Sequence, residues 1–109
     1  MEATILQRLM EVLEDRRANP SQRSYTSQLF VGGVRKIGSK ILEEAREVVE
    51  AAGEPEETRH QHLVHESADL IYHLLVMLGY RGVPWAEVEA ELARRFGISG
   101  LDEKAARTS

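Results

Sequence analysis

Apolar residues recur every three to four positions along most of this chain, the spacing that places them on one face of an α-helix. The pattern predicts four main helices, over about 2–18, 34–52, 56–80 and 84–96. Pro20 and Pro55 mark two of the breaks, because the residue before a proline disfavours helical backbone angles. No stretch alternates apolar and polar residues for long enough to be a strand, so the sequence predicts an all-α fold.

A short additional helix is expected just before the second main helix. Thr26 or Ser27 can act as its N-cap, because a hydroxyl oxygen accepts a hydrogen bond from a free backbone N–H group. Gly32 and Gly33 follow and permit a bend. The expected architecture is a bundle of four to five helices in a single domain spanning residues 1–109, with residues 97–109 as a loose tail.

The helix predicted over 56–80 changes character along its length. Its first half is polar, whereas residues 70–78 are apolar on nearly every side, and a helix that is apolar all round is buried all round. The helix over 34–52 has one broad apolar arc, with Glu44 at its border. We therefore expect residues 70–78 in the middle of a bundle that a second copy of the chain completes.

Composition excludes several classes of protein. With no Cys, no disulfide framework, zinc finger or iron–sulfur cluster is possible, which fits a reducing cytoplasm. No apolar run approaches the roughly 20 residues that a membrane span needs. The formal net charge of −4 offers no broad basic surface for nucleic acid. We expect a cytoplasmic protein that binds neither membrane nor nucleic acid.

Two pairs of carboxylates lie at helical spacing on two different predicted helices. Glu44 and Glu47 are three residues apart, as are Glu66 and Asp69, so each pair shares a helix face. Glutamates alone more often form a solvated surface than a site. Asp69 shifts this balance, because it directly precedes the buried run, and a buried carboxylate needs a cationic partner. We expect the two pairs to converge on a divalent cation.

Oxygen ligands alone favour a hard cation, so Mg²⁺ is expected, with Mn²⁺ as a substitute. Four carboxylates carry more negative charge than one divalent ion neutralises. Lys36 and Lys40 lie two turns and one turn before Glu44. Either these lysines bind phosphate oxygens, or Lys40 forms an ordinary i,i+4 pair with Glu44, and spacing alone does not choose between them.

The histidines fall into two groups. His60, His62 and His65 lack the spacing of a zinc site and are expected on the surface. His73 lies within the buried run on the carboxylate side, where it orients a carboxylate, binds a phosphate or is simply a satisfied core residue. The chain has no glycine-rich phosphate loop and no nucleophile motif. The aromatic residues expected in the core are Tyr72 and Trp85.

These motifs resemble the phosphoribosyl-ATP pyrophosphohydrolase family, within the MazG-like all-α nucleotide pyrophosphohydrolases. The pattern Glu43-Glu44-x-x-Glu47 followed by Glu66-x-x-Asp69 is similar to the motif of the superfamily. Two further segments are similar to the specific family, Tyr25-Thr26-x-x-Leu29 and Tyr72-His73. The resemblance covers about residues 5–96, and Leu42 departs from it, since the family often has Gly there.

The resemblance implies an enzyme that, with Mg²⁺, hydrolyses phosphoribosyl-ATP to phosphoribosyl-AMP and pyrophosphate, the second step of histidine biosynthesis. It also implies a homodimer with its active site near the subunit interface. Carried over by position, the implied metal ligands are Glu44, Glu47, Glu66 and Asp69, and Glu43 supports them or is an additional ligand. The residues implied for substrate contact are Lys36, Lys40, Tyr25, Thr26 and His73.

Two other functions stay open at this point. A house-cleaning pyrophosphohydrolase that acts on non-standard nucleoside triphosphates would use the same carboxylates. A non-catalytic helical module would instead bind partner proteins through its Glu-rich face and would bind no metal. Asp69 beside a buried run argues against the second alternative, because a partner-binding face does not need a carboxylate there.

Overall fold

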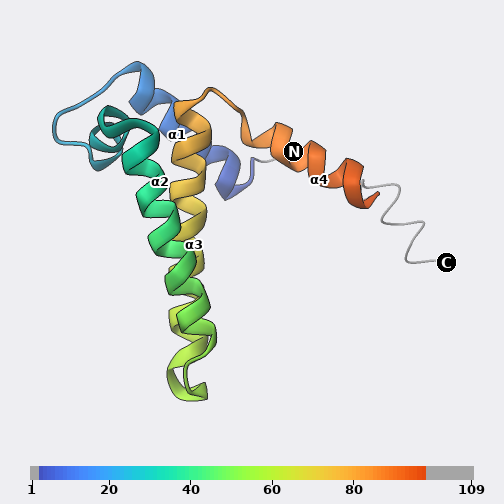
Figure 1. The fold of residues 1–109 in the computed structure, drawn as a ribbon. Helices are drawn as coiled ribbons and strands as arrows, with labels where there is room; N and C mark the ends of the chain where they lie inside the picture. Colours follow the sequence, from blue (N-terminus) through green and yellow to red (C-terminus); the bar gives the residue numbers. More distant parts are fainter. Residues whose placement is uncertain (1–2, 98–109) are drawn as a thin grey trace.

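The computed structural model describes residues 3–97, which form four helices and contain no strand. Figure 1 shows α2 and α3 as a long antiparallel hairpin, with α1 beside the end where α3 finishes and α4 projecting away from it. The all-α prediction is confirmed, whereas the predicted tail lies outside the described residues apart from Gly97. The helices are α1 (Ile5–Ala18), α2 (Tyr25–Ala52), α3 (Glu56–Tyr80) and α4 (Trp85–Phe96).

The residues just before the first helical turns explain where α1 and α4 begin. Thr4 and Gln7 form a capping box, in which the Thr4 hydroxyl accepts from the Gln7 N–H at 3.2 Å and the Gln7 side chain accepts from the Thr4 N–H at 2.9 Å. Pro84 is the N-cap of α4, whereas the sequence had predicted it as the first helical residue.

None of the described helices has the length and apolarity to cross a membrane.

The start of α2 differs from the prediction. Ser24 is the N-cap, because its hydroxyl accepts from the Ser27 N–H at 3.2 Å. The expected caps are used elsewhere: the Thr26 hydroxyl bonds to the Tyr72 hydroxyl, and the Ser27 hydroxyl accepts from the Ser21 N–H at 3.0 Å. These longer-range contacts hold the first turns of α2 against α3 and against the preceding loop.

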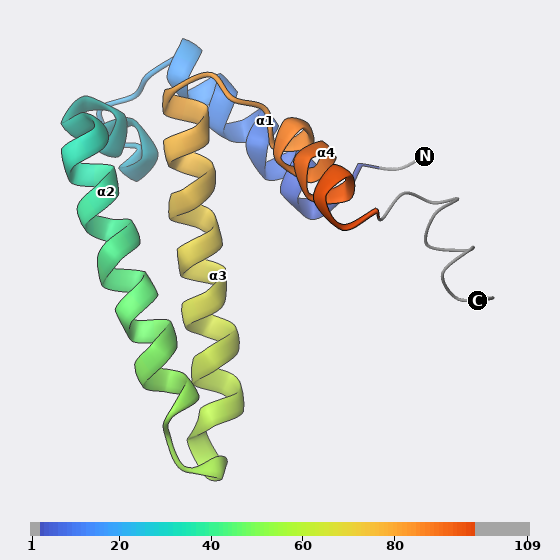
Figure 2. The ribbon, with the colours of Figure 1, turned by 45° about the vertical axis from the view of Figure 1, so that its right-hand side comes forward.

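Gly33 produces the predicted bend within α2. Its backbone angles are φ 65° and ψ −160°, a conformation that is essentially restricted to glycine. The bend separates the segment 25–32 from the long straight part of α2, as both ribbon views show (Figure 2). As a result, Tyr25 and Thr26 turn back towards α3.

The hydrophobic core lies at the end of the hairpin that α1 covers. Burying one such side chain fully stabilises the fold by about 1.5–3 kcal/mol. Tyr72 and Trp85 pack at its edge, as expected. The core residues come from three helices and are Met10, Leu13, Leu29, Ile37, Leu75 and Val76.

The opposite part of the hairpin exposes large apolar side chains. Leu42 and Val49 on α2 are 71% and 72% exposed, and Val64 on α3 is 59% exposed. Ile71 and Leu74 are each 38% exposed. The predicted all-round burial of residues 70–78 is therefore not achieved within one chain.

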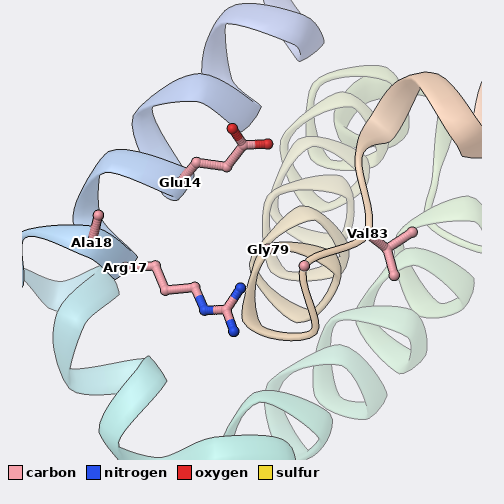
Figure 3. A pocket seen from close by; sticks show the side chains of 6 residues that line it. Glu14, Arg17, Ala18, Gly79 and Val83 are labelled. Atoms are coloured by element: carbon pink, nitrogen blue, oxygen red, sulfur yellow. The ribbon is translucent and has the colours of Figure 1, made fainter.

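A pocket of about 430 Å³ lies between α1 and the turn that follows α3. Figure 3 shows the Arg17 side chain extending from α1 towards Gly79, with Glu14 one turn before it. None of the predicted site residues lines this pocket. The pocket lies where α1 and the end of α3 diverge.

We expect Gly33→Ala to destabilise the fold by about 1–3 kcal/mol, because alanine is strained at this backbone conformation. An added Cβ would also lie 3.1 Å from the Tyr80 hydroxyl. Urea unfolding measures the effect. Gly38→Ala is the matched control: it is a glycine of the same helix with room for a Cβ, so it should be neutral or stabilising by up to about 1 kcal/mol. Equal stability of the two variants would contradict this account.

Candidate metal centre

Carboxylates from α2 and α3 meet at one place on the hairpin. Glu44 and Glu47 of α2 and Glu66 of α3 each offer an oxygen, and these oxygens lie within 4.8 Å of one another. The predicted convergence of two helices is therefore present for three of the four carboxylates. Because the two helices run antiparallel and side by side (Figures 1 and 2), residues on facing turns come into contact.

The fourth predicted ligand, Asp69, belongs to a second group that shares Glu66. Oxygen or nitrogen atoms of His65, Glu66 and Asp69 also lie within 4.8 Å of one another. His65 Nε2 is 3.3 Å from an Asp69 oxygen. The two groups thus form a continuous line of donors in which Glu66 is the common member.

The expectation that Asp69 is the buried carboxylate is wrong. Its side chain is 41% exposed, whereas the side chain of Glu44 is only 11% exposed. Asp69 lies one turn before His73, where the burial of α3 begins. Glu44 is seven residues from both Ile37 and Ala51, so the three residues share one face of α2. Ile37 and Ala51 are buried, and Glu44 is buried with them.

The protonation properties of the cluster follow from this burial. Burial raises the pKa of Glu44 to about 7, and the neighbouring Glu47 carboxylate adds to the rise. A hydrogen bond with Glu47 raises the pKa of Glu66, with burial as a smaller cause. Hydrogen bonds with Glu66 and Glu44 lower the pKa of Glu47. Without a cation, the three carboxylates therefore cannot all ionise readily at neutral pH.

Two oxygens of the cluster suit a cation. Glu44 Oε2 and Glu66 Oε2 are buried and have no hydrogen-bond partner within residues 3–97. Buried polar atoms are nearly always satisfied, so an atom left without a partner calls for a ligand. Oxygen donors from three carboxylates fit Mg²⁺ or Mn²⁺ in charge and hardness. A hollow of about 240 Å³, lined in part by Glu47 and Glu66, lies beside them.

His73 links the cluster to the first turn of α2. It is 5% exposed, and its Nδ1 lies 3.0 Å from the Asp69 carbonyl oxygen. Since a carbonyl only accepts, Nδ1 donates to it. Nε2 lies 3.2 Å from the Tyr25 hydroxyl, and Nδ1 is also 3.6 Å from a Glu44 oxygen. Both ring nitrogens of His73 therefore have partners within the chain, as expected for a satisfied core histidine, and a role towards a carboxylate or a phosphate stays a prediction.

Thr26 and Tyr25 occupy the edge of the same network. The Thr26 hydroxyl is bonded to Tyr72, and the Tyr25 ring stacks on the Tyr72 ring with centroids 6.5 Å apart. Burial raises the pKa of the Tyr25 hydroxyl. Tyr25 is still 47% exposed, so it can contact a ligand that enters beside the carboxylates.

The two lysines are placed differently from each other. Lys40 Nζ lies 3.5 Å from a Glu43 oxygen, so Lys40 pairs with Glu43. The alternative from the sequence, an i,i+4 pair with Glu44, is not formed. The contact with Glu43 raises the pKa of Lys40. Lys36 makes no ion pair with any residue that the structure describes. Glu43 itself is exposed and lies outside both donor groups.

His65, expected from the sequence only as a surface histidine, lies beside the carboxylates. It is exposed, as predicted for all three surface histidines, yet it belongs to the Glu66–Asp69 group. The signal was its four-residue spacing from Asp69, which puts the two side chains on one face of α3. His62 pairs instead with Glu54, at 2.6 Å. Fold and site together define an all-α protein with a candidate divalent-cation centre between two antiparallel helices.

Comparison with known proteins identifies the family. A family model described as phosphoribosyl-ATP pyrophosphohydrolase matches residues 6–96. A curated protein of Rhodopirellula baltica named phosphoribosyl-ATP pyrophosphatase is 53% identical over 102 residues, covering 94% of this chain and 85% of the relative. One of the same name from Geotalea daltonii is 46% identical over 109 residues, covering 98% of both chains. The chain therefore belongs to the phosphoribosyl-ATP pyrophosphohydrolase family of enzymes.

In the metal-free protein we expect the free energy of unfolding to fall as the pH rises from about 4.5 to about 7. Glu44, with its raised pKa, keeps its proton in the folded state after it has lost it in the unfolded state, so rising pH favours unfolding in this window. Glu66 acts in the same direction, whereas the lowered pKa of Glu47 acts below the window. Urea unfolding in EDTA at about pH 5 and about pH 7 measures the difference.

The Glu44→Gln variant should lose most of this pH dependence, because the amide does not ionise. Glu43→Gln is the control, since Glu43 is exposed on the same helix and outside the cluster, and it should keep the slope. A slope that is the same in Glu44→Gln as in the wild type would show that Glu44 does not carry it.

Proposed function

We propose that this chain hydrolyses phosphoribosyl-ATP to phosphoribosyl-AMP and pyrophosphate in a reaction that depends on Mg²⁺, with Mn²⁺ as a substitute. The observation that carries the proposal is the cluster of Glu44, Glu47 and Glu66 with its two unpartnered buried oxygens, in a chain of this family. The reaction is the second step of histidine biosynthesis, and a cytoplasmic location fits it.

Each residue in the centre has a proposed role. Glu44, Glu47, Glu66 and Asp69 would hold the metal, and Glu43 would support them by fixing Lys40. Lys36 and Lys40 would meet phosphate oxygens, while Tyr25, Thr26 and His73 would contact the substrate beside them. His65 is an additional candidate on the exposed side of the donor line. The whole chain would act as one catalytic domain.

The chemistry follows from these placements. When bound, the divalent ion neutralises the polyphosphate and makes a coordinated water easier to deprotonate. The chain supplies the rest: the low pKa of Glu47 keeps its carboxylate ionised at neutral pH, so it can accept a hydrogen bond from the attacking water and orient it. Lys40 sits one turn from Glu44, where its charge stabilises the departing pyrophosphate. Positioning and electrostatics thus account for most of the expected catalysis.

We also propose that the protein is a homodimer. Within residues 3–97 no third helix covers the second face of the α2–α3 hairpin, and that face carries Leu42, Val49 and Ile71. A second copy related by two-fold symmetry would bury these residues against the same residues of its partner and form a four-helix bundle. The carboxylates lie on the same hairpin, so the interface would border the active site.

Pyrophosphate release from phosphoribosyl-ATP, measured with and without Mg²⁺, tests the activity. We expect Glu47→Gln to lower kcat/KM by more than about 100-fold, because loss of even a group that only supports a metal ligand costs about 10- to 100-fold. Glu57→Gln, an exposed glutamate in the first turn of α3, should behave as the wild type. Faster turnover of non-standard nucleoside triphosphates than of phosphoribosyl-ATP would favour the house-cleaning function instead.

Light scattering after size exclusion tests the dimer. The wild type should have twice the mass of the chain, and Leu42→Glu together with Ile71→Glu should give a folded monomer, because the charges cannot be buried against their symmetry copies. Val12→Glu is the control: Val12 is 48% exposed on α1, away from the hairpin face, so this variant should remain a dimer. A monomeric wild type would refute the proposal.

A further inference from the structure

A pocket separate from the carboxylates lies beside the α1–α2 connection. Its volume is about 490 Å³, within the range of sites that bind small molecules. The loop 20–22 forms one wall, and α2 forms the other with Ser27, Gln28, Val31 and Lys36. Among the described residues that line the pocket, Lys36 has the only charged side chain. None of the carboxylates of the metal centre lines it.

The loop wall of this pocket is fixed to α2 by hydrogen bonds. The buried Ser27 hydroxyl accepts from the Ser21 N–H at 3.0 Å, and the Gln28 side chain donates to the Gln22 carbonyl at 3.2 Å. These bonds join residues six positions apart and hold the loop 20–22 against the first turns of α2. The pocket is therefore built before any ligand arrives, which lowers the cost of binding.

Gly32 determines where the Lys36 side chain lies. A Cβ added at Gly32 would lie 2.4 Å from Lys36 Cδ and 2.5 Å from Lys36 Cβ. The lysine stem therefore runs directly over the glycine, in space that any other residue would occupy. With no ion pair to a described carboxylate, its ammonium group is available to an anion that enters the pocket.

Charge is divided sharply along the chain in a way that matches this placement. Residues 16–42 contain six Lys and Arg and no Asp or Glu, although the whole chain has a net charge of −4. Residues 43–69 contain nine Asp and Glu and two Arg. The pocket lies in the basic part and the candidate metal centre lies largely in the acidic part. The basic segment thus favours direct contact with an anionic group, whereas the acidic segment favours contact through a bound cation.

The two sites stand in line along α2. Lys36 and Glu44 are eight residues apart, which is about 12 Å along a helix axis, and Lys40 lies between them. A ligand that reaches both sites must carry anionic groups at two well separated ends. Phosphoribosyl-ATP is such a molecule, because a purine and two ribose rings separate its triphosphate from the phosphate of its second ribose.

We propose that the Lys36 pocket binds the 5′-phosphate of the second ribose, while the carboxylates hold the metal-bound triphosphate. This inference rests on the proposed function and adds to it a specificity site. Lys36 pairs with the phosphomonoester, the hydroxyl and amide groups of the loop face the sugar, and Val31 covers its apolar side. ATP lacks the second ribose phosphate, so it cannot use this pocket.

Ribose 5-phosphate is the direct probe of the pocket. Its dissociation constant should rise by about 10- to 100-fold in Lys36→Gln, the loss expected for a charge-assisted hydrogen bond. Gly32→Ala should have the same effect, because its methyl group displaces the lysine stem. Arg35→Gln is the matched control, since it removes the same charge from the neighbouring exposed residue outside the pocket, and it should change binding less than about threefold.

Kinetics provide the second measurement. The ratio of kcat/KM for phosphoribosyl-ATP to kcat/KM for ATP should fall by about 10- to 100-fold in Lys36→Gln. In the Arg35→Gln control this ratio should stay the same as in the wild type. Equal losses on both substrates would place Lys36 at the triphosphate and overturn the proposal. Should Gly32→Ala fail to fold by circular dichroism, Lys36→Gln alone decides.

The two proposals can fail separately. If the wild type hydrolyses phosphoribosyl-ATP but ribose 5-phosphate binds Lys36→Gln as tightly as the wild type, the pocket assignment is wrong and the activity stands. If ribose 5-phosphate binding depends on Lys36 but phosphoribosyl-ATP is not cleaved, the pocket stands as a phosphomonoester site and the proposed activity is wrong.

Discussion

The structure depends on the packing of α2 against α3, and at the centre of that packing lies an ionisable acid. Glu44 occupies the same row of α2 as Ile37 and Ala51, where an apolar residue would stabilise the helix pair. Its burial beside two further carboxylates is unfavourable for the isolated chain, because like charges in a poorly solvated place repel. A divalent cation would relieve this conflict. The same contact that joins the helices would therefore create the need for the proposed ion.

The sequence predicts most of the fold because periodicity, prolines and glycines act locally. The bounds of α3, the end of α2 and the bend at Gly33 all follow from such signals. The N-cap of α2 was missed because Thr26 and Ser27 make contacts with distant residues, which no local pattern reveals. Burial was the weakest inference: helical spacing paired Glu44 with Glu47 and Glu66 with Asp69, but only the packing shows that Glu44 is the enclosed carboxylate.

The positions of the candidate site residues could be predicted about as well as the fold. Residue spacing grouped the carboxylates correctly by helix, and antiparallel packing then brought three of them together. His65 was predicted only as a surface residue, because an exposed histidine carries little weight until its neighbours in space are known. The exposed apolar surface of the hairpin could not be predicted for a similar reason, because it depends on which helices pack where. Since α1 covers only one end of the hairpin, the rest of α2 and α3 has a second apolar face. Spacing alone assigned this face to the interior.

The contacts of Tyr25 and Thr26 with α3 have a consequence for how the molecule assembles. They join positions that are 48 and 46 residues apart, whereas α2 and α3 meet across a turn of only three residues. Closing a long loop costs more entropy than closing a short one, so the hairpin is the faster unit to form. We expect the segment 25–32 to dock afterwards and to bring Tyr25 and Thr26 into place. The proposed substrate-contact residues would thus reach α3 in the last stage of folding, and a nascent chain would acquire the proposed activity late.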